Sequence, residues 1–218
     1  MKGSKALVML SGGLDSATCL FWAKKKFQDV SAITFNYYQR IENERKATIK
    51  LSNKVNVTNL LEIDIPFIKE SSEFPDGRHL QSIRDTRESS YIPARNLIFY
   101  SIGAYYAEFL GIKWIIGGHN SHDGKFYKDA TKNYIQKINF LFKQGRICCN
   151  DEPCVIVLPL AEMDRKKIIN LAIELNVPLE LTWSCHNKGQ KHCGQCYSCE
   201  QRLEAFNSLC IKDPVFFT

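Results

Sequence analysis

The alternation of short apolar runs with helical segments is the feature of this sequence that most limits its fold. Apolar runs of strand length occur at 6–10, 31–35, 59–65, 113–116 and 155–158. Segments with helical spacing lie at 17–27, 43–53, 96–110, 129–143 and 165–175. Strands that alternate with helices favour a parallel sheet with helices on both faces, because parallel strands need long crossover connections. We therefore expect an α/β fold with a doubly wound, mostly parallel sheet.

A glycine-rich loop joins the first expected strand to the first expected helix and reads Ser-Gly-Gly-Leu-Asp-Ser at 11–16. A loop in this position offers backbone N–H groups and the positive end of a helix dipole to an anion. The alternative is an ordinary turn in which Ser11 or Asp15 caps the helix. We favour an anion site, because two glycines, two serines and an aspartate follow directly on a strand. The expected ligand is a nucleotide phosphate.

This loop differs from the Walker pattern and from Gly-x-Gly-x-x-Gly. It resembles instead the PP-loop of N-type ATP pyrophosphatases, which cleave ATP between the α- and β-phosphates and adenylate a substrate. The resemblance implies that Asp15 stands near a Mg²⁺ ion that shields phosphate charge. It also implies a set of residues that hold pyrophosphate, namely Ser11, Gly12, Gly13 and Ser16.

The size and charge of the chain fit one α/β domain with a small appendage. Its 218 residues can form a substantial core, and a formal charge of +6 with a pI near 8.8 suits anionic ligands such as ATP. The positive charges are spread along the chain, so we expect no direct contact with nucleic acid. No apolar run reaches the roughly 20 residues needed to cross a bilayer, and the N-terminus leads into a strand. We expect a cytoplasmic protein without membrane contact, and a homodimer is left open.

Four of the nine cysteines lie close together near the C-terminus, with the spacing Cys-x7-Cys-x2-Cys-x2-Cys. They are Cys185, Cys193, Cys196 and Cys199. In a reducing compartment such a cluster favours a metal site over disulfides, and four thiolates complete a tetrahedron around one structural zinc ion. An iron–sulfur cluster or redox chemistry is the alternative, because thiolates also bind iron. His186 and His192 could substitute as ligands, but we expect them to be exposed loop residues.

Three polar clusters, at 36–40, 91–96 and 117–123, lie beside expected strands and helices. Because ligands of doubly wound sheets bind beyond the carboxyl ends of the strands, we expect these clusters to converge on one cleft. Arg95 and Asn96 could simply start a helix, with Asn96 as its cap. We favour a role for Arg95 in neutralising ATP phosphates, given the anion site expected nearby.

Other polar residues have more than one interpretation. Asp123 and Asp129 could be a loop carboxylate and a helix N-cap, or they could recognise a base edge or Mg²⁺, and the sequence does not separate these roles. His119 and His122 are expected to be loop donors rather than catalytic bases. The segment 66–92 contains Pro-Asp-Gly and many charges, so we expect a polar insertion or lid there.

Motifs along nearly the whole chain occur together in one order. They are Ser11-Gly12-Gly13-Leu14-Asp15-Ser16, Tyr37-x-Gln39-Arg40, Pro93-Ala94-Arg95-Asn96, Asp123-x3-Tyr127-x-Asp129, Thr182-Trp183-Ser184-Cys185 and Cys193-Gly194-x-Cys196-x2-Cys199. From about residue 5 to about residue 206, this combination resembles the QueC family of 7-cyano-7-deazaguanine synthases. The loop is shared by several enzyme families, and its combination with the cysteine spacing makes the resemblance specific. The sequence departs from the family pattern, at positions that bear on the base pocket, at Asn36, Tyr38, Ala94 and Arg165.

The resemblance implies a HUP-type fold, like that of the adenine nucleotide α-hydrolases. It implies an ATP-binding domain at 1–180 and a helical zinc-binding module at 181–218. It further implies a ligase that converts 7-carboxy-7-deazaguanine and ammonia to the nitrile through an adenylated acid and an adenylated amide, for queuosine or archaeosine biosynthesis. The implied cofactors are ATP as a substrate, Mg²⁺ and one structural Zn²⁺ per chain.

The resemblance also assigns site residues. The expected catalytic residues are Asp15, Ser16 and Arg95. The expected ATP-binding residues are Leu10, Ser11, Gly12, Gly13, Leu14, Asp15, Ser16, Arg95 and Asn96. The expected substrate-binding residues are Gln39, Arg40, Asp123, Tyr127 and Asp129. The expected zinc ligands are the four clustered cysteines.

Two other functions use the same features. A tRNA thiolase, or another adenylating ligase of the superfamily, would need catalytic cysteines outside the zinc set, for which the candidates are Cys148, Cys149 and Cys154. A zinc-knuckle nucleic-acid-binding module would place a concentrated basic and aromatic face at 183–206. Basic and aromatic residues are sparse in that stretch, so we favour the ligase.

Overall fold

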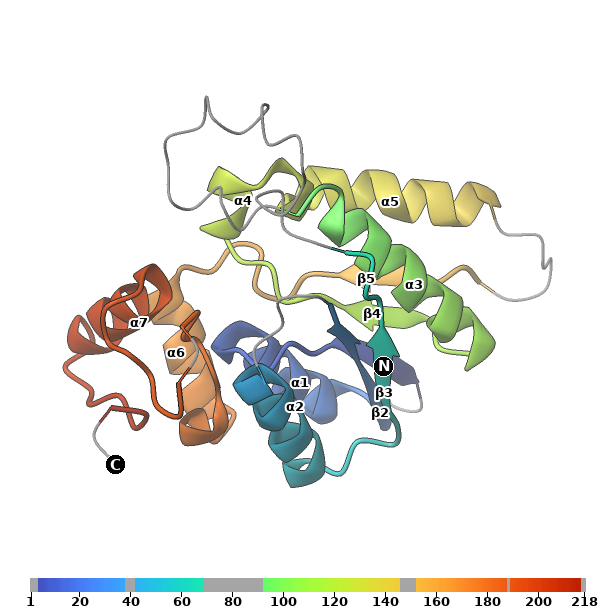
Figure 1. The fold of residues 1–218 in the computed structure, drawn as a ribbon. Helices are drawn as coiled ribbons and strands as arrows, with labels where there is room; N and C mark the ends of the chain where they lie inside the picture. The colour runs from blue at the N-terminus through green and yellow to red at the C-terminus, as the bar shows by residue number, and fades with distance from the viewer. Residues whose placement is uncertain (1–3, 38–41, 69–91, 146–151, 188, 217–218) are drawn as a thin grey trace.

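The computed structural model describes residues 4–37, 42–68, 92–145, 152–187 and 189–216 of the 218-residue chain. In these residues five strands form one sheet, in the order β3-β2-β1-β4-β5 (Figure 1). The strands are β1 (Lys5–Met9), β2 (Asp29–Asn36), β3 (Leu60–Asp64), β4 (Trp114–Ile116) and β5 (Val155–Val157). The strand pairs are parallel, which confirms the predicted parallel sheet.

Helices cover both faces of the sheet (Figure 1). One face carries α1 (Leu14–Lys26), α2 (Glu42–Lys54), α6 (Arg165–Glu174) and α7 (Tyr197–Asn207). The other carries α3 (Arg95–Phe109) and α5 (Lys132–Gly145). Short connections are α4 (Asp123–Phe126) and the 3₁₀ turns Lys128–Ala130 and Leu179–Leu181. The sheet is therefore doubly wound, as predicted.

Successive residues of a strand point to opposite faces of the sheet, so each strand contributes to two hydrophobic cores. Ala6 and Val8 of β1 belong to the core that α1, α6 and α7 cover, whereas Leu7 belongs to the core under α3 and α5. In β4, Ile116 and Ile115 divide between the two cores in the same way. Burial on both faces explains why β1 and β4 appear as continuous apolar runs in the sequence.

The C-terminal helix α7 shares a core with the helices that flank the sheet. Its Phe206 is fully buried in the same cluster as Leu20 of α1 and Ile169 of α6. Arg202, also on α7, is almost fully buried. Residues on both sides of position 180 therefore contribute to one core, and the domain boundary predicted there stays a prediction.

Helix α1 begins earlier than the sequence predicted. It starts at Leu14 rather than at residue 17, directly after the N-cap residue Gly13. No side chain caps this end of the helix, so the alternative in which Ser11 or Asp15 is the cap is wrong. The first turn of α1 therefore belongs to the glycine-rich loop itself, and no side chain caps its N–H groups.

Helix α5 begins later than predicted, at Lys132 rather than at residue 129. Lys128–Ala130 forms a separate 3₁₀ turn before the helix. The hydroxyl of Thr131 then accepts a hydrogen bond from the backbone N–H of Tyr134 at 3.2 Å, as an N-cap residue does. The N-cap alternative considered for Asp129 is therefore wrong, because Thr131 takes that place.

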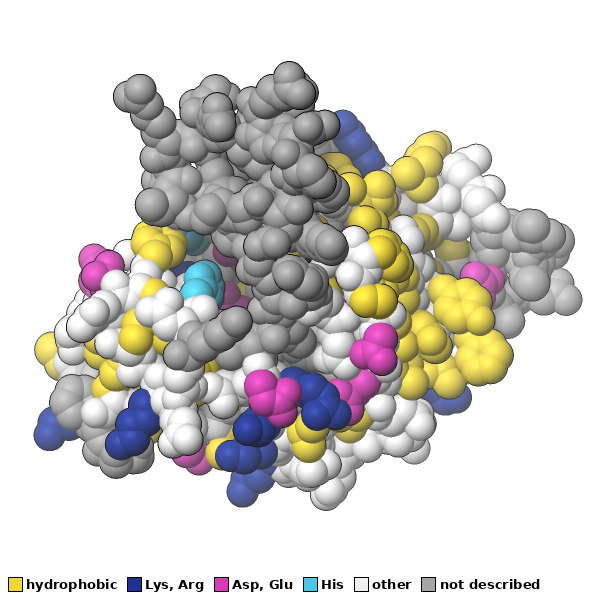
Figure 2. Space-filling view, viewed as in Figure 1, with side chains coloured by type: hydrophobic (Ala, Val, Ile, Leu, Met, Phe, Trp, Pro, Cys, Tyr) yellow, Lys and Arg dark blue, Asp and Glu magenta, His cyan; other side chains and the backbone are white. Residues whose placement is uncertain are grey.

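The surface drawn in Figure 2 carries basic and acidic side chains side by side, and hydrophobic side chains gather over α3. Two exposed aromatic residues of α3 are Tyr105 and Phe109, whose ring centroids lie 6.4 Å apart. Within the described ranges, no helix has both the length and the apolar composition to cross a bilayer.

Candidate functional site

A cavity of about 390 Å³ lies beyond the carboxyl ends of β1, β2 and β4, beside the start of α1. It occupies the switch point of the sheet, where the chain continues from β1 to neighbours on opposite sides. Its lining includes residues of all three predicted polar clusters, represented by Tyr37, Arg95, Asn96, Gly118, His119 and Asp123. For the described residues, the prediction that these clusters converge on one cleft is confirmed; residues 38–40 and 91 lie outside them.

The glycine-rich loop is held by hydrogen bonds between its own residues. The hydroxyl of Ser16 donates to the carbonyl of Gly13 at 3.0 Å and accepts from the backbone N–H of Ser11 at 3.2 Å. The hydroxyl oxygens of Ser11 and Ser16 lie 3.1 Å apart. The loop is therefore shaped before any ligand binds, which lowers the conformational entropy that binding must overcome.

Gly12 fixes the loop against two neighbouring segments. Its φ of +91° is one that other residues rarely adopt, and an added Cβ would lie 2.5 Å from the carbonyl oxygen of Glu44 on α2. On the other side, the carbonyl of Gly12 accepts a hydrogen bond from the backbone N–H of Trp183 at 2.9 Å. Only glycine fits at this position.

Asp15 presents a carboxylate in the first turn of α1. Asn120 donates its side-chain N–H to Asp15 Oδ2 at 2.7 Å. Oδ1 of Asp15 is buried and has no hydrogen-bond partner among the described residues. Burial raises the pKa of Asp15 to about 6, although the positive charge of Arg165 opposes this shift. A buried carboxylate oxygen without a partner fits a divalent cation, since hard cations prefer oxygen ligands.

Three titratable side chains on the cavity wall, those of Arg95, His119 and Asp123, differ in charge. Burial and the positive charge of Arg95 lower the pKa of His119 to about 4, so its ring is neutral at pH 7. His119 Nδ1 lies 4.0 Å from Oδ2 of Asp123, and burial raises the pKa of that carboxyl. The wall therefore offers one fixed positive charge, a neutral imidazole and an acidic group.

Arg165 supplies a second guanidinium to the cavity from the start of α6. Its Nε is buried and has no hydrogen-bond partner among the described residues. Leaving such a donor unpaired costs about 1–3 kcal/mol or more, unless a ligand accepts from it. An anionic ligand beside the glycine-rich loop would remove this cost.

Aromatic side chains form the end of the cavity beyond β2. The rings of Phe35 and Phe99 stack with centroids 4.3 Å apart and an interplanar angle of 18°. Tyr37 packs against Phe99 at a centroid distance of 5.9 Å. All three side chains line the cavity. A flat apolar wall of this kind suits a planar heterocycle such as a nucleobase.

The C-terminal segment closes the opposite side of the cavity. Four of its residues line the wall, namely Trp183, Ser184, His186 and Ser198. The hydroxyl oxygen of Ser198 and Nε2 of His186 lie 3.0 Å apart, which links the start of α7 to the chain that follows Cys185. The segment that carries the cysteines therefore also forms part of the site.

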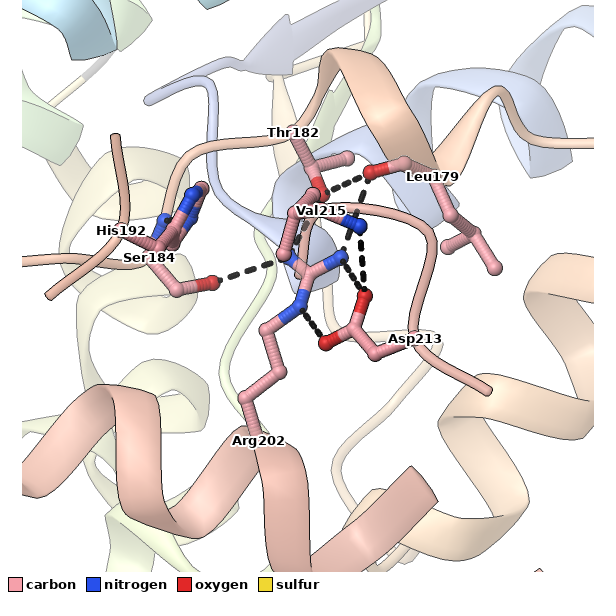
Figure 3. A network of polar contacts seen from close by, with 7 residues as sticks. All are labelled: Leu179, Thr182, Ser184, His192, Arg202, Asp213 and Val215. Carbon is pink, nitrogen blue, oxygen red and sulfur yellow. Dashed lines mark hydrogen bonds and ion pairs between the residues drawn. The ribbon is translucent and has the colours of Figure 1, made fainter. Parts of the chain in front are cut away.

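Arg202 holds this wall in place through a buried network (Figure 3). It makes a two-pronged ion pair with Asp213, with Nε–Oδ2 and Nη2–Oδ1 distances of 2.6 and 3.0 Å. Its Nη1 donates to the hydroxyls of Thr182 at 2.7 Å and Ser184 at 3.1 Å, on either side of Trp183. Its Nη2 also donates to the carbonyl of Leu179. The network positions the residue that contacts Gly12.

The four clustered cysteines converge in space. Their Sγ atoms all lie within 4.8 Å of one another, so together they could hold a metal ion. Backbone N–H groups of Gln195 and Cys196 donate to Cys193 Sγ at 3.4 and 3.3 Å. These donors lower the pKa of Cys193, which favours the thiolate that metal binding requires.

Neither nearby histidine belongs to the cysteine cluster. His186 is exposed, as predicted, and is paired with Ser198. The prediction that His192 is exposed is wrong, because it is half-buried and its Nε2 accepts from the backbone N–H of Ser184 at 3.0 Å. Its ring also packs on Trp183 at a centroid distance of 4.3 Å. Both residues instead support the wall of the cavity.

Most residues expected to bind ATP lie together. Of this set, all but Gly12 line the cavity, namely Leu10, Ser11, Gly13, Leu14, Asp15, Ser16, Arg95 and Asn96; Asp123, from the expected substrate-binding set, also lines it. Asn96 does not cap α3, because that helix already begins at Arg95.

The expected substrate-binding residues Tyr127 and Asp129 are not among the residues that line the cavity. Gln39 and Arg40 lie outside the described residues, as does most of the expected insertion at 66–92. The roles of all these residues stay predictions.

Several residues of the site were not predicted from the sequence. Arg165 was noted as a departure from the family pattern but was given no role, although it follows β5 in the chain, and the reasoning applied to the other strand ends could have assigned it one. Asn120 lies within a predicted cluster, but its contact with Asp15 spans 105 positions in the sequence and leaves no local signal. The same holds for Ser184 and Ser198, which reach the cavity only through the packing of α7.

Comparison with known proteins places these features in one family. The sequence model of the family described as "Queuosine biosynthesis protein QueC" matches residues 5–210. The 7-cyano-7-deazaguanine synthase of Thermoplasma volcanium is 37% identical over 98% of this chain and 91% of its own length. The synthase of Trichodesmium erythraeum is 36% identical over 97% of this chain and 99% of its own.

A solved structure supports the fold alone. The U34-tRNA thiolase NcsA from Methanococcus maripaludis, described with its [4Fe-4S] cluster, aligns with a TM-score of 0.52 over 95% of this chain and 66% of that chain. Its sequence identity is 17%, so the likeness concerns the arrangement of strands and helices. The family match over nearly the whole chain, together with full-length relatives above 35% identity, shows that this chain belongs to the QueC family.

Proposed function

We propose that this chain is a 7-cyano-7-deazaguanine synthase, which converts 7-carboxy-7-deazaguanine and ammonia to the nitrile with ATP. The observation that carries the proposal is the full-length match to relatives of that name. The cavity supports it, because one space contains a phosphate-type loop, two arginines and an aromatic wall. The substrate carboxylate and ATP are both anionic, which suits the two guanidinium groups.

The first half of the reaction activates the acid. A carboxylate is a poor electrophile, so one of its oxygens attacks the α-phosphorus of ATP, and pyrophosphate leaves from the new acyl adenylate. The N–H groups of the first turn of α1, which no side chain caps, and the hydroxyls of Ser11 and Ser16 would bind the leaving pyrophosphate. Arg95 and Arg165 would neutralise charge that develops on the phosphates.

The second half removes the remaining oxygen. Ammonia attacks the acyl adenylate, AMP leaves, and a proton is released to give the amide. The amide oxygen then attacks the α-phosphorus of a second ATP, pyrophosphate leaves, and loss of AMP and of both protons on the nitrogen forms the carbon–nitrogen triple bond. Positioning and charge neutralisation carry most of this chemistry, which agrees with a site whose His119 is neutral.

Mg²⁺ would be held by Asp15, whose unpaired Oδ1 is the described carboxylate oxygen that best fits a cation. When bound, the ion would supply positive charge that shields the phosphates. Because the pKa of Asp15 is raised to about 6, this carboxyl is neutral below that pH and charged above it. An ordinary aspartate would remain charged down to about pH 4.

We therefore expect the Mg²⁺-dependent part of ATP binding to weaken as the pH falls through about 6. Isothermal calorimetry between pH 5 and 8, with and without Mg²⁺, measures this effect. Asp15→Asn gives the baseline, since only the ionisation of the nucleotide and of other groups remains in that variant. Asp123→Asn should move the midpoint to lower pH, because the negative charge of Asp123 contributes to the raised pKa of Asp15. A wild-type curve that coincides with the Asp15→Asn curve would contradict the role of Asp15.

We propose that the metal in the cysteine cluster is one structural Zn²⁺. In a tetrahedron of sulfurs about 2.3 Å from zinc, neighbouring sulfurs are roughly 3.8 Å apart. The Sγ atoms of Cys193 and Cys199 lie 3.9 Å apart, and those of Cys185 and Cys196 lie 4.0 Å apart. Four thiolates leave no open position for a reactive water, so a structural role follows.

Cys193→Ser is expected to lose the metal and to lower the thermal stability of the protein. The variant removes one ligand, and metal binding of this kind contributes directly to folding. Metal content by mass spectrometry should be about one zinc per chain in the wild type and well below that in the variant. Cys210→Ser is the matched control, because this exposed cysteine stands outside the cluster. Retained zinc, or zinc loss without any change in stability, would contradict the proposal.

The remaining predictions are part of the same proposal. Gln39, Arg40, Tyr127 and Asp129 would contribute to the base pocket once substrate binds, and the segment 66–92 would act as a lid. The chain would work in the cytoplasm on free small molecules with ammonium as the nitrogen source. Its product would serve queuosine biosynthesis, which the family's description names, or archaeosine biosynthesis.

The proposal is tested by incubating the purified protein with ATP, Mg²⁺, ammonium and 7-carboxy-7-deazaguanine, and by following the products by mass spectrometry. The expected product is the nitrile, with the amide as an intermediate. A parallel reaction contains tRNA and a sulfur donor. Thiolated tRNA without any nitrile would overturn the proposal in favour of the thiolase alternative.

A further inference from the structure

Asn120 stands directly behind Asp15 and does not itself line the cavity. Its side chain is 2% exposed. Its Nδ2 donates to Asp15 Oδ2 at 2.7 Å, which links the loop after β4 to the first turn of α1. Because Asp15 faces the cavity and Asn120 lies behind it, any effect of Asn120 on a ligand passes through the aspartate.

The orientation of the Asn120 amide is fixed by its other end. Its Oδ1 accepts from the backbone N–H of His122 at 2.7 Å and from that of Asp123 at 3.0 Å. Its own backbone N–H donates to Asp123 Oδ2 at 3.2 Å. Since the oxygen is occupied by two backbone donors, the amide nitrogen must face Asp15. The alternative orientation would place two acceptors against each other.

The two carboxylate oxygens of Asp15 differ in their hydrogen-bond partners. Oδ2 is engaged by Asn120, whereas Oδ1 is buried without a partner in the described part of the chain. A carboxylate that is held at one oxygen cannot rotate freely, so its second oxygen keeps one direction. Partners of this kind behind a ligating group typically change metal affinity by 10–100-fold.

We propose that Asn120 is a positioning residue, which orients the Asp15 carboxylate so that Oδ1 is free for a divalent cation bound with nucleotide phosphates. This inference rests on the proposed function, since it takes the role of Asp15 from it. It adds a residue that binds neither nucleotide nor metal. The hydrogen bond from Asn120 also lowers the pKa of Asp15, so its removal should raise that pKa further above its present value of about 6.

Asn120→Ser tests the proposal. A serine hydroxyl can still accept from the backbone two or three residues on, as serine does in turns, but it is too short to reach Asp15. The Mg²⁺ gain is the factor by which Mg²⁺ increases the affinity for ATP, measured by calorimetry. In the variant this factor should be 10–100-fold smaller than in the wild type, whereas the affinity for ATP in EDTA should be unchanged. The midpoint of this gain should also move to higher pH.

The matched control is Asn139→Ser. Asn139 on α5 makes two comparable bonds to the backbone of Ile156 on β5, at 2.9 and 2.7 Å, away from the cavity. It should lower the melting temperature without changing the Mg²⁺ gain or its pH midpoint. The pKa of Asp15 also depends on the nearby charges of Arg165, Asp123 and Arg202. These three residues are unchanged in both variants.

The outcomes separate this inference from the proposed function. If Asn120→Ser and the wild type show the same Mg²⁺ gain and the same pH midpoint, the positioning role is overturned while the proposed function stands. If Asn120→Ser weakens ATP binding equally with and without Mg²⁺, Asn120 only supports the fold, and the inference is likewise overturned. A wild-type protein that binds no ATP would overturn both.

Discussion

Arg202→Met is expected to destabilise the protein by about 3–5 kcal/mol, because it leaves Asp213 as an uncompensated charge in the core. Arg202 and Asp213 are 1% and 0% exposed as side chains. The substitution also removes the donors that hold Thr182, Ser184 and the carbonyl of Leu179 (Figure 3). The free energy of unfolding from urea titration, followed by circular dichroism, measures the loss.

The chain provides a matched control in Arg45→Met. Arg45 makes the same two-pronged contact with Glu62, at 2.6 and 3.1 Å, but both side chains are exposed to a substantial degree. An exposed pair contributes only about 0–1 kcal/mol, so this variant should unfold nearly as the wild type does. Equal losses in the two variants would show that burial does not decide the strength of the Arg202 pair.

A double variant separates the pair from its surroundings. Arg202→Met combined with Asp213→Leu removes both charges and should recover part of the lost stability, because no unpaired charge stays buried. Recovery should be incomplete, since the hydroxyls of Thr182 and Ser184 still lack their donor. A double variant less stable than Arg202→Met would contradict this explanation.

Gly12→Ala is expected to lower kcat/KM for nitrile formation at least a hundredfold, because it moves the phosphate-binding loop. The new Cβ would lie 2.5 Å from the carbonyl oxygen of Glu44 and 3.0 Å from the hydroxyl of Thr48. The backbone must shift to relieve these contacts, and displacements near 1 Å in a site can reduce rates about a hundredfold. ATP affinity by calorimetry and turnover by product mass measure the two effects.

Gly111→Ala controls for backbone strain alone. Gly111 also has a positive φ, of +64°, but an added Cβ would meet no atom within 4 Å. The variant should lose roughly 1–2 kcal/mol of stability from the strained backbone and keep its ATP affinity. If Gly12→Ala resembled Gly111→Ala in turnover, the close fit of the loop against α2 would have no bearing on function.

The fold was predictable because its strongest signals are local. Strands β1, β2 and β4 are buried on both faces, so they appear as apolar runs regardless of the details of packing. Parallel strands end at the same edge, so the clusters at 36–40, 91–96 and 117–123 could be placed around one cleft before their contacts were known. The boundaries were less predictable, since Thr131 rather than Asp129 precedes α5.

The supporting residues of the site were not predictable for a physical reason. Arg202 appears in the sequence as one more basic residue near the cysteines, and only the packing of α7 shows that it is buried with Asp213. Asn120 is an ordinary loop asparagine until the chain brings it to Asp15. Residues that act through tertiary contacts leave no spacing pattern, whereas the glycine-rich loop and the cysteines do.

Both oxygens of the substrate carboxylate are expected to leave through adenylation. The measurement uses 7-carboxy-7-deazaguanine that carries ¹⁸O in both carboxylate positions, incubated with the protein, ATP, Mg²⁺ and ammonium. We expect two AMP molecules for each nitrile, each with one ¹⁸O atom, and two unlabelled pyrophosphates. Label in inorganic phosphate with formation of ADP, or unlabelled AMP, would contradict this expectation.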